Sequence, residues 1–384
     1  MPKQYDYLII GAGIIGTSLA AELGSHKKSV LLIEQFDVAG GASGANLGQI
    51  SLMDRFEDWH MKLALETLEE YRFIQNSNPL GFRQHGGSIV LISEEQRKRA
   101  RNVGLVQNHR GIHMEILQKE DIRLLEPHLR KPDLLGLAYC PEEGSIDPLA
   151  LVYYQLDRAL SHNVDLLVHT EVNGFVTKGR EIQAVVTSRG NYQADVVVNC
   201  AGGWAQNIAD MLGEGLPIRS HKGTAFVTSP LPPLFQTTLV GGGFLMEDTG
   251  EKAPAFRVGT ALCQHENGSI VLGQATEQSP AGDRSLSKEG LGETASNLLH
   301  YFPVLQSADI IRSWAVSTSY SADGKPVMGF SPQWDNVLTV AGFKGAFSTA
   351  LAVAKAARDM LLRGQDFVQE LRPRDFEKET RSCG

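Results

Sequence analysis

The sequence has few cysteines and no cysteine motif. Its four cysteines, Cys140, Cys200, Cys263 and Cys383, are scattered over 384 residues without a CxxC or CxxH pair. Zinc and iron–sulfur sites need closely spaced ligands, and a disulfide scaffold needs a denser set of cysteines. The sequence therefore predicts no metal site and no disulfide framework, and it favours a reducing, cytoplasmic setting.

A long apolar run and an excess of positive charge are also missing. The apolar stretch 7–15 is interrupted by glycines, so neither a signal peptide nor a membrane span is expected. The formal net charge of −8 gives no general attraction to nucleic acid or anionic lipid. We therefore expect a small-molecule partner, with no nucleic acid and no integral membrane segment.

No internal repeat, low-complexity tract or long linker divides the chain. With 384 residues that are 42% hydrophobic, it can bury a large core, and its length suits two lobes. Because no linker separates them, we expect the lobes to be interleaved. One lobe is predicted to comprise residues 1–80, 145–215 and 325–384, and the other residues 81–144 and 216–324.

Hydrophobic periodicity predicts a mixture of strands and helices. Strands are expected at 5–10, 30–34, 87–93, 165–169, 173–177, 181–188, 194–199 and 337–341, and helices at 14–23, 57–76, 94–110, 148–163, 288–301 and 348–362. The β-rich region 221–273 favours an antiparallel sheet covered by the helix at 288–301. The predicted fold class is α/β, with a Rossmann-like lobe interleaved with an α+β lobe that contains a largely antiparallel sheet.

A glycine pattern between the first strand and the first helix predicts a dinucleotide site. Gly11 permits a tight turn, Gly13 lets a pyrophosphate approach the backbone, and Gly16 allows the helix to pack closely on the strand. Glu34 ends the second strand, where a carboxylate can accept hydrogen bonds from the adenosine ribose. That carboxylate disfavours NADP, but the pattern leaves both FAD and NAD open.

The segment after this acid suits a long cofactor. Residues 40–50 combine small residues with hydroxyl, amide and backbone N–H groups, which can follow a pyrophosphate toward a ring system.

Several further motifs make the chain resemble the amino-acid-oxidising flavoproteins that include glycine oxidase, sarcosine oxidase and D-amino-acid oxidase. They are Ala-Ser-Gly-Ala-Asn at 42–46, Gly-Ser-Ile-Asp-Pro at 144–148, Val-Asn-Cys-Ala-Gly-Gly-Trp at 198–204, Arg-Ser-Trp-Ala at 312–315, Asp-Gly-Lys-Pro at 323–326 and Val-Ala-Gly-Phe-Lys-Gly at 340–345. The resemblance spans nearly the whole length. It implies an FAD-binding lobe and FAD-dependent oxidation of a primary or secondary amine, by hydride transfer to flavin N5, giving an imine that hydrolyses.

The resemblance also implies a set of FAD-binding residues. Lys344 lies in a turn before a helix, where positive charge would stabilise the reduced flavin. The implied set is Gly11, Gly13, Ile14, Ile15, Gly16, Glu34, Gln35, Ala42, Ser43, Asn46, Gly48, Gln49, Ile50, Val172, Cys200, Ala201, Gly202, Trp204, Gly324, Lys325, Gly342, Phe343, Lys344, Gly345 and Ala346.

The chain departs from the family pattern on the substrate side. Thr318 stands where many members carry an arginine that holds the substrate carboxylate, so Lys344, Arg312 or His60 has to supply the positive charge. Tyr320 can add a hydroxyl to the same pocket. The segments in which relatives attach flavin covalently lack the required cysteine and histidine, which predicts non-covalent FAD.

Alternatives to an amine oxidase remain open at this point. The usual Gly-His-Gly turn is replaced by Lys-Gly-Ala-Phe at 344–347, so the electron acceptor is either oxygen or another carrier. A flavoprotein subunit that depends on partner chains is one alternative, and oxidation of a 2-hydroxy acid or glycerol phosphate is another. An NAD-dependent dehydrogenase is a third alternative. It is disfavoured because an enzyme that binds NAD would have no use for the C-terminal turns that lie beside the flavin in the family.

Overall fold

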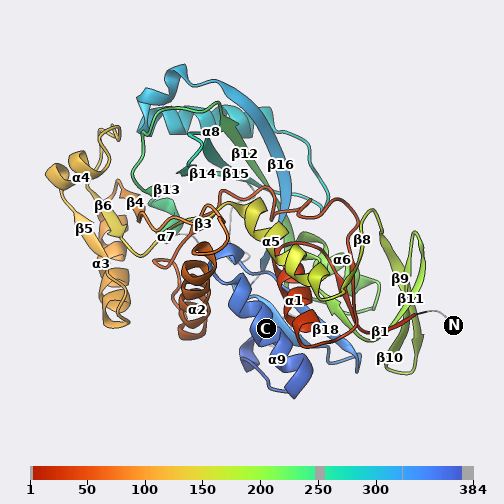
Figure 1. Cartoon of the computed structure of the whole chain (residues 1–384). Helices are drawn as coiled ribbons and strands as arrows, with labels where there is room; N and C mark the ends of the chain where they lie inside the picture. Colours follow the sequence, from red (N-terminus) through yellow and green to blue (C-terminus); the bar gives the residue numbers. More distant parts are fainter. Residues whose placement is uncertain (1–2, 247–255, 322, 374–384) are drawn as a thin grey trace, which may run out of the picture.

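The computed structural model describes residues 3–246, 256–321 and 323–373, and two large sheets organise them (Figure 1). In the first sheet, β1 pairs in parallel with β2 and β11, and further parallel pairs join β2 to β8 and β11 to β18. An antiparallel strand, β17, closes one edge. The strand order is β17 (Val327–Phe330), β18 (Val337–Ala341), β11 (Gly190–Asn199), β1 (Gln4–Ile10), β2 (Val30–Ile33) and β8 (Asp165–Leu167).

Both faces of the first sheet are covered, which explains why β2 and β18 consist of buried residues throughout. Tyr7 and Ile9 pack against the helical layer, whereas Leu8 and Ile10 belong to the apolar cluster on the opposite face. The helical layer consists of α1 (Ile14–Ser25), α5 (Pro148–Ser161) and α9 (Ala350–Arg363). The opposite layer contains β9 (Val172–Lys178), β10 (Glu181–Thr187) and α6 (Ala205–Asp210).

Local signals fix several helix ends. Asp147 caps α5 by accepting hydrogen bonds from the N–H groups of Leu149 and Ala150, and Pro148 occupies the first turn. At the other end of the chain, α9 stops at Gly364, whose φ of +62° is the left-handed conformation that ends many helices.

The second sheet is antiparallel except where β13 pairs with β4. Its order is β16 (Ile310–Ser321), β12 (Ile218–Thr228), β15 (Ile270–Gln278), β14 (Phe256–Gln264), β13 (Thr238–Gly241), β4 (Gly87–Leu91), β6 (Gly136–Cys140) and β5 (Glu115–Leu117). Helix α8 (Lys288–Tyr301) covers one face, and α2 (Asp58–Gln75) and α3 (Glu94–His109) pack on the other. Smaller elements are β3 (Gln49–Ile50), β7 (Gly144–Ser145), α4 (Lys119–Leu125) and α7 (Gly243–Met246).

The predicted fold class is confirmed. The first sheet takes its strands from residues 4–10, 30–33, 165–199 and 327–341, and the second from residues 87–140 and 218–321. The predicted excursion after α5 returns to the first sheet, since β11 lies between β1 and β18. The lobe boundaries themselves stay a prediction. In the described parts of the chain, no helix combines the length and apolar character that a bilayer span requires.

Candidate cofactor and substrate site

The glycine turn after β1 leaves no room for side chains. Gly11 has a φ of +107°, and a Cβ there would lie 2.5 Å from the carbonyl oxygen of Cys200. A Cβ on Gly16 would lie 1.9 Å from the carbonyl oxygen of Gly11, so α1 packs directly on the turn. These contacts give Gly11 and Gly16 the structural roles that the motif predicts.

Glu34 is oriented by backbone groups at the end of β2. Its carboxylate accepts hydrogen bonds from the N–H of Ala12 at 2.8 Å and from the N–H of Phe36 at 2.9 Å. The side chain is buried yet lines a cavity at the carboxyl ends of β1, β2, β11 and β18. Ligands of doubly wound sheets bind at this edge, where the chain reverses its direction of strand addition.

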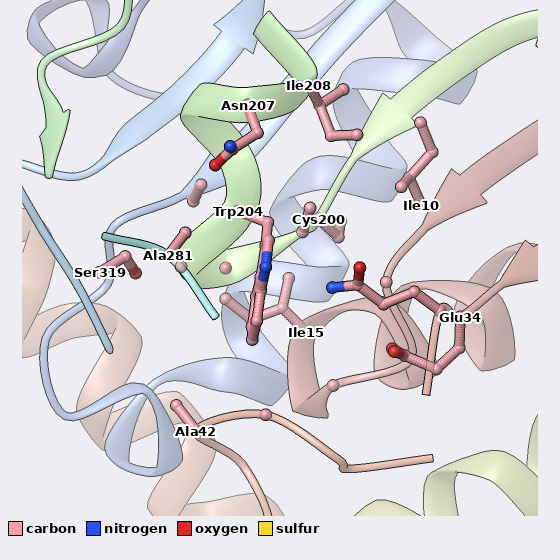
Figure 2. Close-up of a pocket in the computed structure, with 18 of the residues that line it drawn as sticks. Ile10, Ile15, Glu34, Ala42, Cys200, Trp204, Asn207, Ile208, Ala281 and Ser319 are labelled. Atoms are coloured by element: carbon pink, nitrogen blue, oxygen red, sulfur yellow. The ribbon is translucent and has the colours of Figure 1, made fainter. Parts of the chain in front are cut away.

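This first cavity has a volume of about 410 Å³. Figure 2 shows Glu34, Trp204 and Ala42, from three separate segments, arranged around it. Sixteen of the predicted cofactor residues line it: Gly11, Gly13, Ile14, Ile15, Glu34, Gln35, Ala42, Ser43, Val172, Cys200, Ala201, Gly202, Trp204, Gly342, Phe343 and Ala346.

A second cavity of about 250 Å³ adjoins the first. The two share six lining residues: Ile14, Ala42, Ser43, Ser319, Phe343 and Ala346. Five further predicted residues line the second cavity and not the first: Asn46, Gln49, Lys344, Gly345 and Tyr320. The trough that results suits a dinucleotide whose second ring system reaches a separate substrate space.

A buried arginine organises the turn that carries Lys344. Arg55 is 1% exposed and donates hydrogen bonds to the carbonyl oxygens of Lys344 at 3.4 Å and Gly345 at 3.3 Å. Gly345 has a φ of +60°, and a Cβ there would lie 2.4 Å from the guanidinium. The turn therefore wraps closely around Arg55, a residue that the sequence patterns did not mark.

The charges around the second cavity are strongly coupled. Burial works to raise the pKa of Asp54, but the positive charges of Arg55 and Lys344 outweigh it and hold that pKa below its usual range. Burial, together with the charge of Arg55, lowers the pKa of His60 to about 3. Burial therefore favours neutral His60, and His60 lines neither cavity, so the structure gives no support to the hypothesis that it supplies a positive charge to the substrate.

Glu143 is a further cavity residue that the sequence patterns did not mark. It is fully buried, lines the second cavity, and accepts hydrogen bonds from the N–H groups of Leu52 and Met53, both at 2.6 Å. Burial raises its pKa to about 8, against the opposing effect of these two hydrogen bonds. The carboxyl group is therefore largely protonated at neutral pH.

The candidate substrate-binding residues on β16 line two different cavities. Thr318 and Tyr320 line the second cavity, and Tyr320 meets the ring of His221 edge to face at 4.9 Å. Arg312 is exposed and lines a different hollow, together with Trp314 and Arg284. The structure thus does not bring Arg312 together with Lys344 and Tyr320.

The remaining predicted residues lie around the trough rather than on its surface. The N–H of Gly48 donates a hydrogen bond to Asn46 Oδ1 at 2.8 Å, and Ile50 is buried in β3. Gly324 and Lys325 form the turn after β16, where Lys325 pairs with Glu370 at 2.6 Å. Neither of these two turn residues lines the two cavities.

Comparisons with known proteins agree with this geometry. The family described as "DAO: FAD dependent oxidoreductase" matches residues 6–360. Glycine oxidase of Geobacillus kaustophilus is 24% identical over 352 residues, which cover 89% of this chain and 88% of that protein. The beta subunit of sarcosine oxidase from Rhodobacter capsulatus is 25% identical, over 94% of this chain and 86% of that protein.

Solved structures show the same fold. L-proline dehydrogenase from P. horikoshii superposes with a TM-score of 0.87 at 23% identity, over 99% of each chain. Glycine oxidase from Geobacillus kaustophilus gives a TM-score of 0.84 at 21% identity, over 94% of this chain and 96% of that chain. The chain belongs to the DAO family of FAD-dependent oxidoreductases, and glycine oxidase and sarcosine oxidase are among the relatives it resembles.

Proposed function

We propose that this enzyme oxidises an amino acid or an N-substituted amino acid, with FAD held non-covalently. The bound FAD would take a hydride at flavin N5 from the carbon next to the amine nitrogen. Loss of this hydride and of the N–H proton would leave an imine, which water would hydrolyse. The observation that carries the proposal is that Lys344 and Tyr320 both line the second cavity, next to the cavity that suits the dinucleotide.

The charged residues at this cavity favour a substrate with a carboxylate. Lys344 and Arg55 are positive, and Asp54 is the ionised acid beside them. Burial favours the neutral forms of His60 and Glu143, and among these five side chains Lys344 is the cation that lines the second cavity. A substrate carboxylate would interact favourably with this ammonium group.

We assign the contact with that carboxylate to Lys344. Lys344 lines the second cavity. Its ammonium group lies 5.9 Å from the centre of the Phe244 ring, which lines the same cavity. Thr318 cannot supply a positive charge, and Arg312 lines another hollow. Tyr320 would orient the amine or the carboxylate through its hydroxyl.

The dinucleotide would be held by the first cavity. Glu34 would accept hydrogen bonds from the ribose, and the N-terminus of α1 would face the pyrophosphate. Val172 would border the adenine, and the 342–346 turn would border the flavin. Burial raises the pKa of Cys200 to about 12, so its thiol is a poor nucleophile, which supports non-covalent binding.

A second candidate is a dehydrogenase subunit that passes electrons to a partner chain. Relatives named as subunits include the sarcosine oxidase chain described above and an opine oxidase chain of Rhizobium meliloti, which is 26% identical over 376 residues. Purification of the native protein with companion chains would favour this second candidate. The three described cysteines are free and buried, which supports a cytoplasmic location in either case.

Visible spectroscopy tests the proposal directly. We expect a yellow protein whose flavin bands bleach when one of glycine, sarcosine, proline or hydroxyproline is added without oxygen. Denaturation should release the flavin into the supernatant. Reoxidation by air would then identify oxygen as an acceptor, and a yellow protein that no amino acid bleaches would contradict the proposed substrate class.

Replacement of Lys344 tests its assignment. Lys344→Met should weaken binding of the bleaching amino acid about 10- to 100-fold, the usual effect of losing a charged hydrogen bond, and leave the flavin spectrum in place. Lys62→Met is the matched control, because Lys62 is exposed on α2. Equal binding by the Lys344 variant and the control would contradict the assignment.

A further inference from the structure

One side of the second cavity is built by three neighbouring strands of the second sheet, β4, β13 and β14 (Figure 1). Ile89 on β4, Val240 on β13 and Ala261 on β14 all line the cavity. They are register partners, since Val240 pairs with Ile89 on one side and with Ala261 on the other. Directly paired residues share a face of a sheet, so these side chains form one continuous apolar row.

Helix α7 adds two more apolar side chains to this side of the cavity. Phe244 and Leu245 both line it. Leu245 is buried in the same apolar cluster as the three strand residues, and Phe244 packs against that cluster. These five residues are called the apolar wall below. They line the second cavity and not the first, so the wall lies on the side that the dinucleotide cavity does not share.

Polar residues of the second cavity are engaged with other parts of the protein. Glu143 Oε1 accepts its two backbone hydrogen bonds, and a Cβ on Gly87 would lie 1.9 Å from Glu143 Oε2, so this oxygen faces the backbone of β4. Gln49 Nε2 donates to Thr238 Oγ1 at 3.4 Å. A polar group that reached the apolar wall would lose water and gain no hydrogen bond from the five wall side chains.

Asp54 also lines the second cavity, but its charge is offset by neighbours. Its Oδ1 accepts a hydrogen bond from Ser51 Oγ at 2.8 Å, and its Oδ2 lies 3.6 Å from Arg55 Nη1. A carboxylate beside a guanidinium attracts a further cation less than an isolated carboxylate does. The cavity therefore favours an apolar substrate side chain over a basic one.

Lys344 lies beside the apolar wall. Its ammonium group, which we assign to the substrate carboxylate, is 5.9 Å from the centre of the Phe244 ring. In an amino acid the carboxylate, the amine and the side chain all branch from one carbon atom. A carboxylate bound by Lys344 would therefore leave the side chain of the substrate within reach of the wall.

We propose that the apolar wall binds the substrate side chain, and that the substrate is an amino acid, or its N-alkyl derivative, with an apolar side chain. Glycine and sarcosine, which have no side chain, are then poor substrates. The inference rests on the proposed function, because it takes Lys344 as the carboxylate contact. Each methylene group buried against the wall should strengthen binding about fourfold.

The test compares rates of flavin bleaching without oxygen. Glycine, alanine, 2-aminobutyrate and norvaline add one methylene at a time, and each is supplied in both enantiomers where they exist and with a free or an N-methylated amine. The second-order rate constant of bleaching should rise about fourfold per methylene. Leucine should exceed asparagine, which has nearly the same shape, by at least about 100-fold, because the amide would lack partners at the wall.

A pair of variants ties this preference to the wall. Val240→Thr places a hydroxyl in the wall with little change of shape, and should lower the ratio of the leucine rate constant to the asparagine rate constant about tenfold. Val90→Thr is the matched control. Val90 follows Ile89 on β4, is buried in the apolar cluster on the opposite face of the sheet and lines neither cavity, so this variant should keep the wild-type ratio.

The outcomes separate this inference from the proposed function. Bleaching by every member of the graded series at equal rates would overturn the apolar class and leave amino-acid oxidation standing. Fastest bleaching by lysine, added to the same panel, would also overturn it, in favour of recognition by Asp54. Equal changes of the ratio in Val240→Thr and Val90→Thr would remove the wall from side-chain recognition. A yellow protein that no amino acid bleaches would overturn the proposed function and this inference with it.

Discussion

Glu143 should make the stability of the protein fall as pH rises from mildly acidic to mildly alkaline values. Its side chain is fully buried, and while Oε1 accepts two backbone hydrogen bonds, Oε2 has no hydrogen-bond partner among the described residues. Burial raises the pKa from 4.5 to about 8. Folding therefore requires this carboxyl group to keep a proton that the unfolded chain would release.

The sign and size of the effect follow from proton linkage. Below about pH 4.5 both states are protonated and Glu143 makes no difference between them. Between pH 4.5 and about 8 the unfolded chain loses the proton first, so stability is lost progressively and levels off above pH 8. At about 1.4 kcal/mol per pH unit, the full effect is on the order of 5 kcal/mol as an upper limit.

Glu143→Gln isolates this effect. The amide oxygen can still accept from Leu52 and Met53, and the side chain cannot ionise. We expect the variant and the wild type to unfold at similar temperatures at pH 5, with the variant increasingly more stable toward pH 9. Glu142→Gln, at the neighbouring half-buried position, should follow the wild-type profile.

Thermal unfolding of the holoprotein, followed by flavin fluorescence at each pH, measures the difference. Other titrating groups, such as His60, are the same in both proteins and cancel from the comparison. A stability gap between variant and wild type that is equal at pH 5 and pH 9 would refute the reasoning, because it would mean that Glu143 does not change its protonation on unfolding.

Further predictions concern the backbone turn and the cofactor site. Gly345→Ala should lower the free energy of unfolding by about 2–3 kcal/mol, because its φ of +60° is strained for alanine and its Cβ would meet Arg55. Gly292→Ala, in α8 with open space around it, should raise that free energy by about 0.5–1 kcal/mol, and thermal unfolding compares the two. Glu34→Ala should weaken FAD binding at least about tenfold, measured by titrating apoprotein with FAD; unchanged affinity would remove Glu34 from the site.

The dinucleotide site was predictable because its signals are local. The strand, the glycine turn, the helix and Glu34 all fall within the first 34 residues, and each constrains the next. The structure places nearly all of the predicted residues from this region on the first cavity. The later contributions, from β11 and the 342–346 turn, were predicted from the family resemblance and not from periodicity.

The charged centre of the second cavity was not predictable in this way. Arg55 and Asp54 stand before α2 in a stretch without a recognisable motif, and Arg55 is buried where it contacts the turn at Lys344 and Gly345. Glu143 likewise depends on the backbone of Leu52 and Met53, some ninety residues away. Long-range packing creates both features.

The sequence suggested that Arg312 and Tyr320 share a pocket, but the length of the strand between them separates them. Positions 312 and 320 point to the same side of β16 by strand alternation, which makes a shared pocket plausible from sequence. A strand advances about 3.3 Å per residue, so eight residues place Arg312 roughly 26 Å from Tyr320. The length of β16 therefore carries Arg312 beyond the cavity that Tyr320 lines.

The position of β11 between β1 and β18 has a consequence for the order in which the protein matures. A ribosome delivers β1 and β2 first, but the strand that completes the cofactor edge, Val337–Ala341, and the turn after it come last. Until then β11 presents an unpaired edge, the kind of surface that promotes aggregation. Cofactor insertion must therefore follow synthesis of nearly the whole chain, and FAD supply would govern how long newly made protein stays exposed to misassembly and degradation.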